Sequence, residues 1–141
     1  MNFFIDYIKK CILRVENTPI EQMQKFVTDV PNARALHAAI GISTEAGELL
    51  DGFKKALVYG GREIDKVNIG EEIGDLMWYV GLLCDAYGYD LKRCVEVNEA
   101  KLRTRYAHKF TDGEAHERDL FQERSVLESG FSEGDKNVSS K

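Results

Sequence analysis

Apolar residues recur at helical spacing in several segments of the chain, and glycine, proline and short polar stretches separate these segments. The first segment, residues 3–15, predicts an amphipathic helix with one apolar face. Thr18 is expected to cap a second helix, with Glu21 in the capping-box position. That helix should run to about Asp29, and Pro31 should end it. The chain is therefore expected to open with two helices.

Two longer helices are expected in the middle of the chain. The first begins near Asn32 and stops at the Tyr59-Gly60-Gly61 turn, and the second runs to about Tyr87 after a polar loop over residues 60–70. On the first helix, a broad arc of large apolar residues is separate from a stripe of small and acidic ones. The arc comprises Leu36, Ile40, Ile42, Leu49, Leu50, Phe53 and Leu57, and the stripe comprises Gly41, Glu45, Glu48 and Gly52.

The second of these helices is apolar on all sides over part of its length. From Leu76 to Cys84 it carries no charge, a pattern typical of a buried helix. Glu72, Asp75 and Tyr79 share one narrow sector of the same helix. The acidic pair is therefore expected on a side that the helix buries one turn later.

A further helix should follow the Gly88-Tyr89-Asp90 break, with Asp90 as its cap. On this helix Asn98 lies in an otherwise apolar stripe, and Lys101 and Arg105 border that stripe one turn apart. The two basic residues are either solvated helix charges or, if the helix lies across from the acids, cations for phosphate groups. The stripe comprises Leu91, Val95, Asn98, Leu102 and Tyr106.

Acidic pairs are the strongest chemical signal in the sequence. Glu45 and Glu48, like Glu72 and Asp75, lie three residues apart and so point to one side of a helix. Four carboxylates brought together repel one another, at a cost of roughly 3 kcal/mol for each pair about 6 Å apart. A hard cation such as Mg²⁺ or Mn²⁺, which prefers oxygen ligands, would relieve this repulsion. The alternative is that both pairs lie on solvated faces of two amphipathic helices.

Composition limits the classes of function. The chain has 141 residues, enough for one domain, and its net charge of -5 argues against binding to polymeric nucleic acid. The three cysteines, which lack metal-ligand spacing, indicate reduced thiols and a cytoplasmic protein. No run of about 18 apolar residues is present, so we expect no membrane span.

The ordered acidic pairs resemble the metal-binding pattern of the MazG-like all-α nucleoside triphosphate pyrophosphohydrolases, in particular the short single-domain type. The resemblance covers about residues 36–110. The residues that carry it are Leu36 to Gly41, Glu45 to Leu49, Tyr59-Gly60, Glu71 to Tyr79, and the set Asn98, Lys101, Leu102, Arg105 and Tyr106.

The resemblance implies hydrolysis of a (d)NTP to a (d)NMP and pyrophosphate by water attack at the α phosphorus. Glu45, Glu48, Glu72 and Asp75 would be the catalytic residues and would hold Mg²⁺, with Mn²⁺ as a substitute. The residues implied in substrate binding are Lys101 and Arg105 for the phosphates, Asn98, and Tyr79 and His37 for the base or sugar. For His37 and Tyr79, ordinary surface or core packing is the alternative.

Two departures from the family pattern are visible. Many relatives begin the first motif with two adjacent acids, but Thr44 stands at the earlier position here, so Glu45, Glu48 or Glu71 would have to serve as the general base. Some relatives also carry a lysine four residues before each acidic pair, where this chain has Gly41 and Asn68. A related pyrophosphohydrolase of deoxyuridine, deoxycytidine or histidine-pathway nucleotides, and a catalytically inactive oligomerisation or regulatory protein on the same scaffold, are the alternative functions.

The fold expected is an all-α bundle of four to five helices with a central acidic metal site. We expect a helical catalytic domain over residues 1–110, a helical arm over 111–128 beginning near Glu114, and a disordered tail over 129–141. As in the family, a homodimer or homotetramer is expected.

Overall fold

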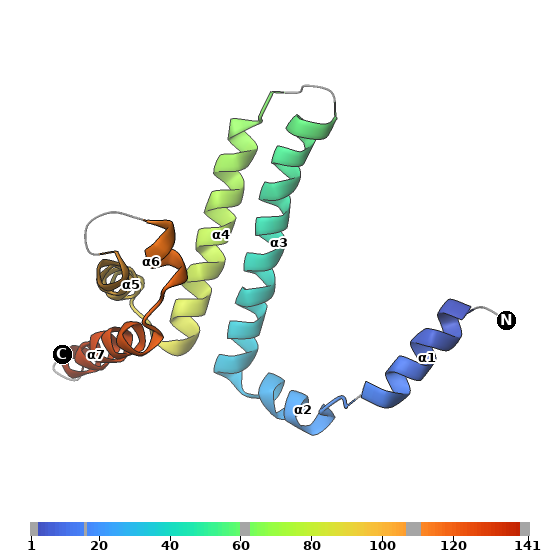
Figure 1. Cartoon of the computed structure of the whole chain (residues 1–141), viewed down its shortest axis with the longest axis horizontal. Helices are drawn as coiled ribbons and strands as arrows, with labels where there is room; N and C mark the ends of the chain where they lie inside the picture. The colour runs from blue at the N-terminus through green and yellow to red at the C-terminus, as the bar shows by residue number, and fades with distance from the viewer. Residues whose placement is uncertain (1–2, 16, 60–62, 107–110, 139–141) are drawn as a thin grey trace.

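A computed structural model of the chain describes residues 3–15, 17–59, 63–106 and 111–138. Within these residues all regular structure is helical, which confirms the all-α prediction (Figure 1). The helices are α1 (Phe3–Val15), α2 (Ile20–Thr28), α3 (Val30–Val58), α4 (Lys66–Tyr87), α5 (Leu91–Arg105), α6 (Asp112–His116) and α7 (Leu120–Val138).

The two longest helices, α3 and α4, lie antiparallel and side by side along most of their length (Figure 1). Aspartates fix where each begins. The Asp29 carboxylate accepts a hydrogen bond from the Asn32 amide at the start of α3, and Asp65 accepts bonds from the first amides of α4. Gly88 ends α4 in the left-handed conformation, at φ 70°, which glycine adopts without a steric penalty. This pair holds the predicted acidic residues.

A second helix pair is formed by α5 and α7. Gly130 of α7 lies against Val97 of α5, because a Cβ atom at residue 130 would lie only 2.7 Å from a Val97 methyl group. The Arg93 guanidinium donates two hydrogen bonds to the Gly130 carbonyl, and the rings of Tyr89 and Phe131 meet with centroids 5.7 Å apart. These contacts place α7 across α5.

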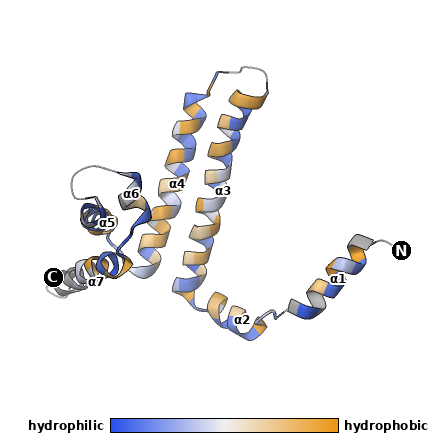
Figure 2. Cartoon of the chain, in the orientation of Figure 1, coloured by the Kyte–Doolittle hydropathy of each residue, from blue (hydrophilic) through white to orange (hydrophobic). Residues whose placement is uncertain are grey.

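The α3–α4 pair leaves many large apolar side chains exposed. Figure 2 shows hydrophobic residues along the full length of both helices. Leu57 of the predicted apolar arc is 84% exposed and Trp78 of α4 is 60% exposed. The expectation that α4 is buried on all sides is therefore wrong for this single chain, since α4 packs mainly on α3. On α3 the stripe of small and acidic residues, rather than the large apolar arc, faces α4.

Several expected helix boundaries differ from the observed ones. Pro19, not Thr18, occupies the N-cap position of α2, and no side chain caps that end. Pro31 lies in the first turn of α3 instead of ending α2. Proline is tolerated there because the amide hydrogen that it lacks would have no partner within the helix in the first turn. α4 begins at Lys66, within the predicted loop, where Asp65 caps it; residues 60–62 lie outside the described residues.

The C-terminal part also differs from the expectation. The helix predicted from Glu114 is divided into α6 and α7, and the Asp119 carboxylate accepts a bond from the Gln122 amide where α7 begins. The segment predicted to be a disordered tail is helical as far as Val138. Its polar composition did not reveal the packing of Gly130 on α5 or the contact of Phe131 with Tyr89, just before α5, and both support this helix. Residues 139–141 lie outside the described part of the chain.

None of the described helices combines the length and apolar character that a membrane span requires.

Candidate metal centre

Two glycines control how closely α3 and α4 approach. Gly41 is buried, and a Cβ atom there would lie 2.2 Å from the Tyr79 ring, so this ring fills the space beside the glycine. Three turns further along α3, a Cβ on Gly52 would lie 3.4 Å from the side-chain oxygen of Asn68. Because the helices are antiparallel, each turn forward on α3 faces one turn back on α4. This register brings Glu45 opposite the acidic pair of α4.

Three carboxylates meet on this seam. One oxygen from each of Glu45, Glu72 and Asp75 lies within 4.8 Å of the other two. Glu72 is 5% exposed, Glu45 is half-buried and Asp75 is exposed, so the group opens to solvent on one side. The sequence placed all three residues in one acidic site, and the fold brings them together.

The group is electrostatically uncompensated in the described part of the chain. No ion pair between described residues involves Glu45, Glu72 or Asp75. Burial raises the pKa of the Glu45 carboxyl, and the negative charges of Glu48, Asp75 and Glu72 raise it further. A hydrogen bond from Thr44 acts in the opposite direction. The site therefore favours the arrival of positive charge.

The three oxygens suit a hard divalent cation. Ligands on opposite sides of Mg²⁺ lie roughly 4.2 Å apart, since each Mg²⁺–oxygen distance is about 2.1 Å. The observed limit of 4.8 Å is therefore close to a coordinating arrangement. Three carboxylates also leave positions for water and phosphate oxygens, as Mg²⁺ sites in phosphate-handling proteins do.

Glu48 lies outside this three-residue group and is exposed. Its negative charge nevertheless contributes to the raised pKa of Glu45, one turn away on α3. The structure thus brings three of the four predicted ligands together and leaves the fourth at their edge.

Tyr79 lies one helical turn beyond Asp75 on α4, and His37 lies about two turns before Glu45 on α3. Their rings meet edge to face with centroids 5.8 Å apart, and the Trp78 ring meets Tyr79 at 4.8 Å. Tyr79 is half-buried against Gly41, whereas His37 is exposed. The two predicted base-contacting or sugar-contacting residues are therefore neighbours on the same seam as the acids.

The predicted phosphate-binding residues lie on α5, which packs against α7. The Lys101 amine donates a 2.7 Å hydrogen bond to the Asn98 side-chain oxygen. Asn98 is exposed, so the otherwise apolar stripe in which it lies is not the buried face of α5. The buried residue of α5 is Val97, on the face toward α7. Arg105 points to the C-terminal segment. Among the described residues, no hydrogen bond or ion pair joins these side chains to the carboxylates of α3 and α4.

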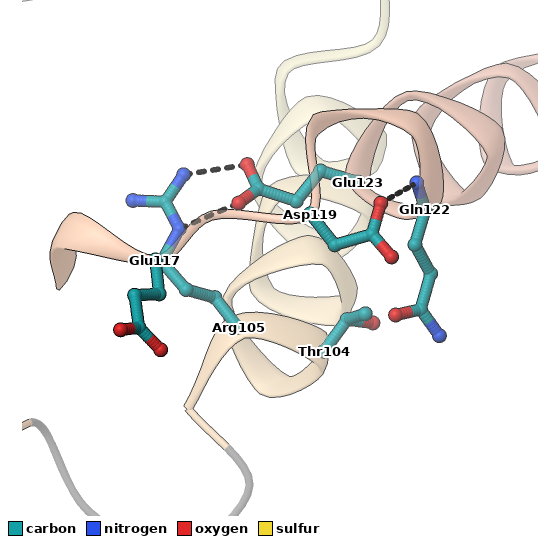
Figure 3. Close-up of a pocket in the computed structure, with 6 residues that line it drawn as sticks. All are labelled: Thr104, Arg105, Glu117, Asp119, Gln122 and Glu123. Atoms are coloured by element: carbon teal, nitrogen blue, oxygen red, sulfur yellow. Dashed lines mark hydrogen bonds and ion pairs between the residues drawn. The ribbon is translucent and has the colours of Figure 1, made fainter. Parts of the chain in front are cut away.

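Arg105 is committed to a second carboxylate. Its guanidinium donates hydrogen bonds of 2.8 and 2.6 Å to the two Glu123 oxygens, and Arg118 donates to the same carboxylate at 3.3 and 2.8 Å. Figure 3 shows the Arg105–Glu123 pair at the rim of a small hollow between α5 and the start of α7. The hollow is lined by Thr104, Arg105, Glu117, Asp119, Gln122 and Glu123. Three acids against one guanidinium make it a poor site for a triphosphate.

Sequence reasoning missed two side chains that matter here. Asn68 donates a 2.6 Å hydrogen bond to Glu72, and its position one turn before the acid was a usable signal. Glu123 is 4% exposed, and its guanidinium partner Arg105 lies 18 residues away in the chain, so helical spacing gave no hint of the pairing.

Comparison with known proteins identifies the family to which the chain belongs. A family model described as the MazG nucleotide pyrophosphohydrolase domain matches residues 36–110, just over half of the chain, and this range contains all the predicted site residues. No curated protein and no solved structure matches the chain. The family match confirms the resemblance seen in the ordered acidic motifs, and the chain belongs to the MazG nucleotide pyrophosphohydrolase family.

Proposed function

We propose that this chain is a metal-dependent nucleoside triphosphate pyrophosphohydrolase. In the proposed reaction, water attacks the α phosphorus of a (d)NTP, the bond from that phosphorus to the bridging oxygen breaks, and pyrophosphate leaves with the bond electrons. The products are a (d)NMP and pyrophosphate. The observation that carries the proposal is the convergence of Glu45, Glu72 and Asp75 within 4.8 Å in a chain of this family.

Glu45, Glu72 and Asp75 would hold Mg²⁺ or Mn²⁺, with Glu48 as a fourth ligand or as the base that accepts the proton of the attacking water. A bound divalent cation would neutralise phosphate charge and lower the pKa of that water. The raised pKa of Glu45 supports this use, because an uncompensated carboxylate gains from a nearby cation. His37 and Tyr79 would contact the base or sugar beside the acids.

Lys101 and Arg105 remain proposed phosphate contacts, and Asn98 a proposed substrate contact, on the strength of the family alone. Lys101 is half-buried and, among the described residues, is held only by the neutral Asn98, so its charge is available to pyrophosphate. Arg105 would first have to exchange Glu123 for phosphate. For either residue to bind the phosphates, α5 must lie beside the acidic site formed by Glu45, Glu72 and Asp75, either in the same chain or in another copy of the chain.

The exposed apolar arc of α3 supports assembly into a homodimer or homotetramer. Ile40, Leu50 and Leu57 are all exposed, whereas soluble monomers rarely expose large contiguous apolar surface. The free cysteines, none of them in a disulfide, support a reducing location such as the cytoplasm.

The direct test is release of pyrophosphate and orthophosphate from a panel of ribo- and deoxyribonucleoside triphosphates with Mg²⁺, Mn²⁺ or EDTA. We expect the protein to release pyrophosphate and no orthophosphate, and to do so only when metal is present. This activity should be lost in Asp75→Asn. Asp85→Asn is the matched control, since Asp85 lies on the same helix but forms an exposed ion pair with Arg34. Absence of hydrolysis with every nucleotide and metal would favour an inactive oligomerisation or regulatory protein on this scaffold.

A further inference from the structure

Glu72 is the most buried of the three carboxylates, and its surroundings differ from those of an ordinary buried acid. A buried carboxylate is normally balanced by a cation or by several hydrogen-bond donors. In the described chain the side chain that donates to Glu72 is Asn68, whose amide nitrogen lies 2.6 Å from Oε1. The amide supplies a directed hydrogen bond but no net positive charge.

The Asn68 side chain is itself confined. Its backbone amide donates to Asp65, which caps α4, and its side-chain oxygen faces Gly52 on α3. A Cβ at Gly52 would lie 3.4 Å from that oxygen, so the two helices bracket the amide. The side chain is thus held between α3 and the Glu72 carboxylate, one turn before the acid.

We propose that Asn68 is a positioning residue that orients Glu72 for the divalent cation without competing for its charge. The hydrogen bond occupies Oε1 and leaves Oε2 for the cation. A lysine, which some relatives carry at this position, would also donate, but it would add a positive charge beside the three acids. The neutral amide therefore keeps the acidic group dependent on metal for charge balance. This inference rests on the metal site of the proposed function.

The test is Mn²⁺ binding, followed by electron paramagnetic resonance, together with the Tm of the metal-free protein. Asn68→Ala should weaken Mn²⁺ binding roughly 10- to 100-fold, the usual cost of losing a residue that orients a metal ligand. Asn68→Leu keeps the volume of the side chain but loses the donor, so it should weaken Mn²⁺ binding by a similar factor while the metal-free Tm stays near that of the unmodified protein. Loss of affinity in both variants is a signature that a purely structural packing role would not give, because leucine would restore the packing.

Asn32→Ala is the matched control. Asn32 links the same two helices at their other end, where its side-chain oxygen accepts a 2.9 Å hydrogen bond from the Tyr87 hydroxyl. This variant loses an amide between α3 and α4 without touching the acids, so it should bind Mn²⁺ as the unmodified protein does. Circular dichroism establishes that each variant keeps its helices.

The outcomes separate this inference from the proposed function. If the unmodified protein binds Mn²⁺ and Asp75→Asn does not, the metal site stands. Unchanged affinity in both Asn68 variants would then overturn the role of Asn68 alone. If the unmodified protein fails to bind Mn²⁺, both the site and the role of Asn68 are overturned.

Discussion

The two helix pairs each enclose a buried glutamate, and they treat its charge in opposite ways. In the α5–α7 pair, Glu123 receives two guanidinium groups, and hydrogen bonds from Arg105 and Arg118 lower its pKa to about 2. In the α3–α4 pair, Glu72 receives one neutral amide and faces two further acids. The first arrangement is complete by itself and stabilises a structure. The second is incomplete and calls for a cation.

The largest expected difference is in activity. Glu72→Gln should lower nucleotide hydrolysis by about 100-fold or more, since losing a ligand should exceed the cost of losing its supporting residue. The same variant should not lower the Tm of the metal-free protein, because it removes repulsion from the acidic group. Glu128→Gln, a change at an exposed glutamate paired with Arg124, is the control. A large loss of metal-free stability in Glu72→Gln would contradict the contrast between the pairs.

The converse substitution should act on stability. Glu123→Gln leaves Arg105 and Arg118 side by side without a counter-charge, and the Arg105 side chain is only 15% exposed. We expect the Tm of Glu123→Gln to fall by on the order of 10 °C, whereas the Tm of Glu128→Gln should be nearly unchanged. Differential scanning calorimetry measures both. Equal melting temperatures for the two variants would show that the buried pair stabilises no more than a surface pair.

The close helix contact beside the metal site should be sensitive to one methyl group. Gly41→Ala places a Cβ within 2.2 Å of the Tyr79 ring and should cost roughly 1–3 kcal/mol as the helices separate. Gly47→Ala is the control, because nothing lies within 4 Å of a Cβ there. Alanine in that exposed helical position should stabilise by about 0.5–1 kcal/mol. Chemical denaturation should therefore give changes of opposite sign.

The smallest effect is a pH dependence. Because the folded state lowers the pKa of Glu123 to about 2, from an ordinary 4.5, its stabilising effect is fully present above pH 4.5. That contribution is lost as the pH falls toward 2, where the folded protein must also take up the proton. The free energy of unfolding should therefore decrease as the pH is lowered from 4.5 toward 2. In Glu123→Gln the free energy of unfolding should depend less steeply on pH over the same range. Identical slopes would mean that Glu123 is not held by the two arginines.

The acidic site could be predicted from the sequence because its geometry is local. Glu72 and Asp75 share a face through helical spacing alone, and a short connection between two long helices makes them antiparallel neighbours, which brings Glu45 opposite. The glycines at 41 and 52 signalled a close approach, and the structure places α4 there.

The α5–α7 pair could not be predicted because its determinants are distant in the chain. Gly130 lies in a polar, glycine-containing segment, and its contacts with Val97 and Arg93 of α5, which the composition does not reveal, explain why a helix forms there. Arg105 is basic and borders a helical stripe, as a phosphate ligand would, yet its partner is Glu123. The apolar residues of α4 predicted burial, but the α3 surface that covers this helix is narrow, so Trp78 stays exposed.

The metal site itself is best tested by Mn²⁺ titration of the unmodified protein beside Asp75→Asn and Asp85→Asn. We expect saturable Mn²⁺ binding that Mg²⁺ displaces, and we expect this binding to be lost in Asp75→Asn and kept in Asp85→Asn. Binding of equal strength in all three proteins, or in none of them, would contradict the assignment of Glu45, Glu72 and Asp75 as a metal site.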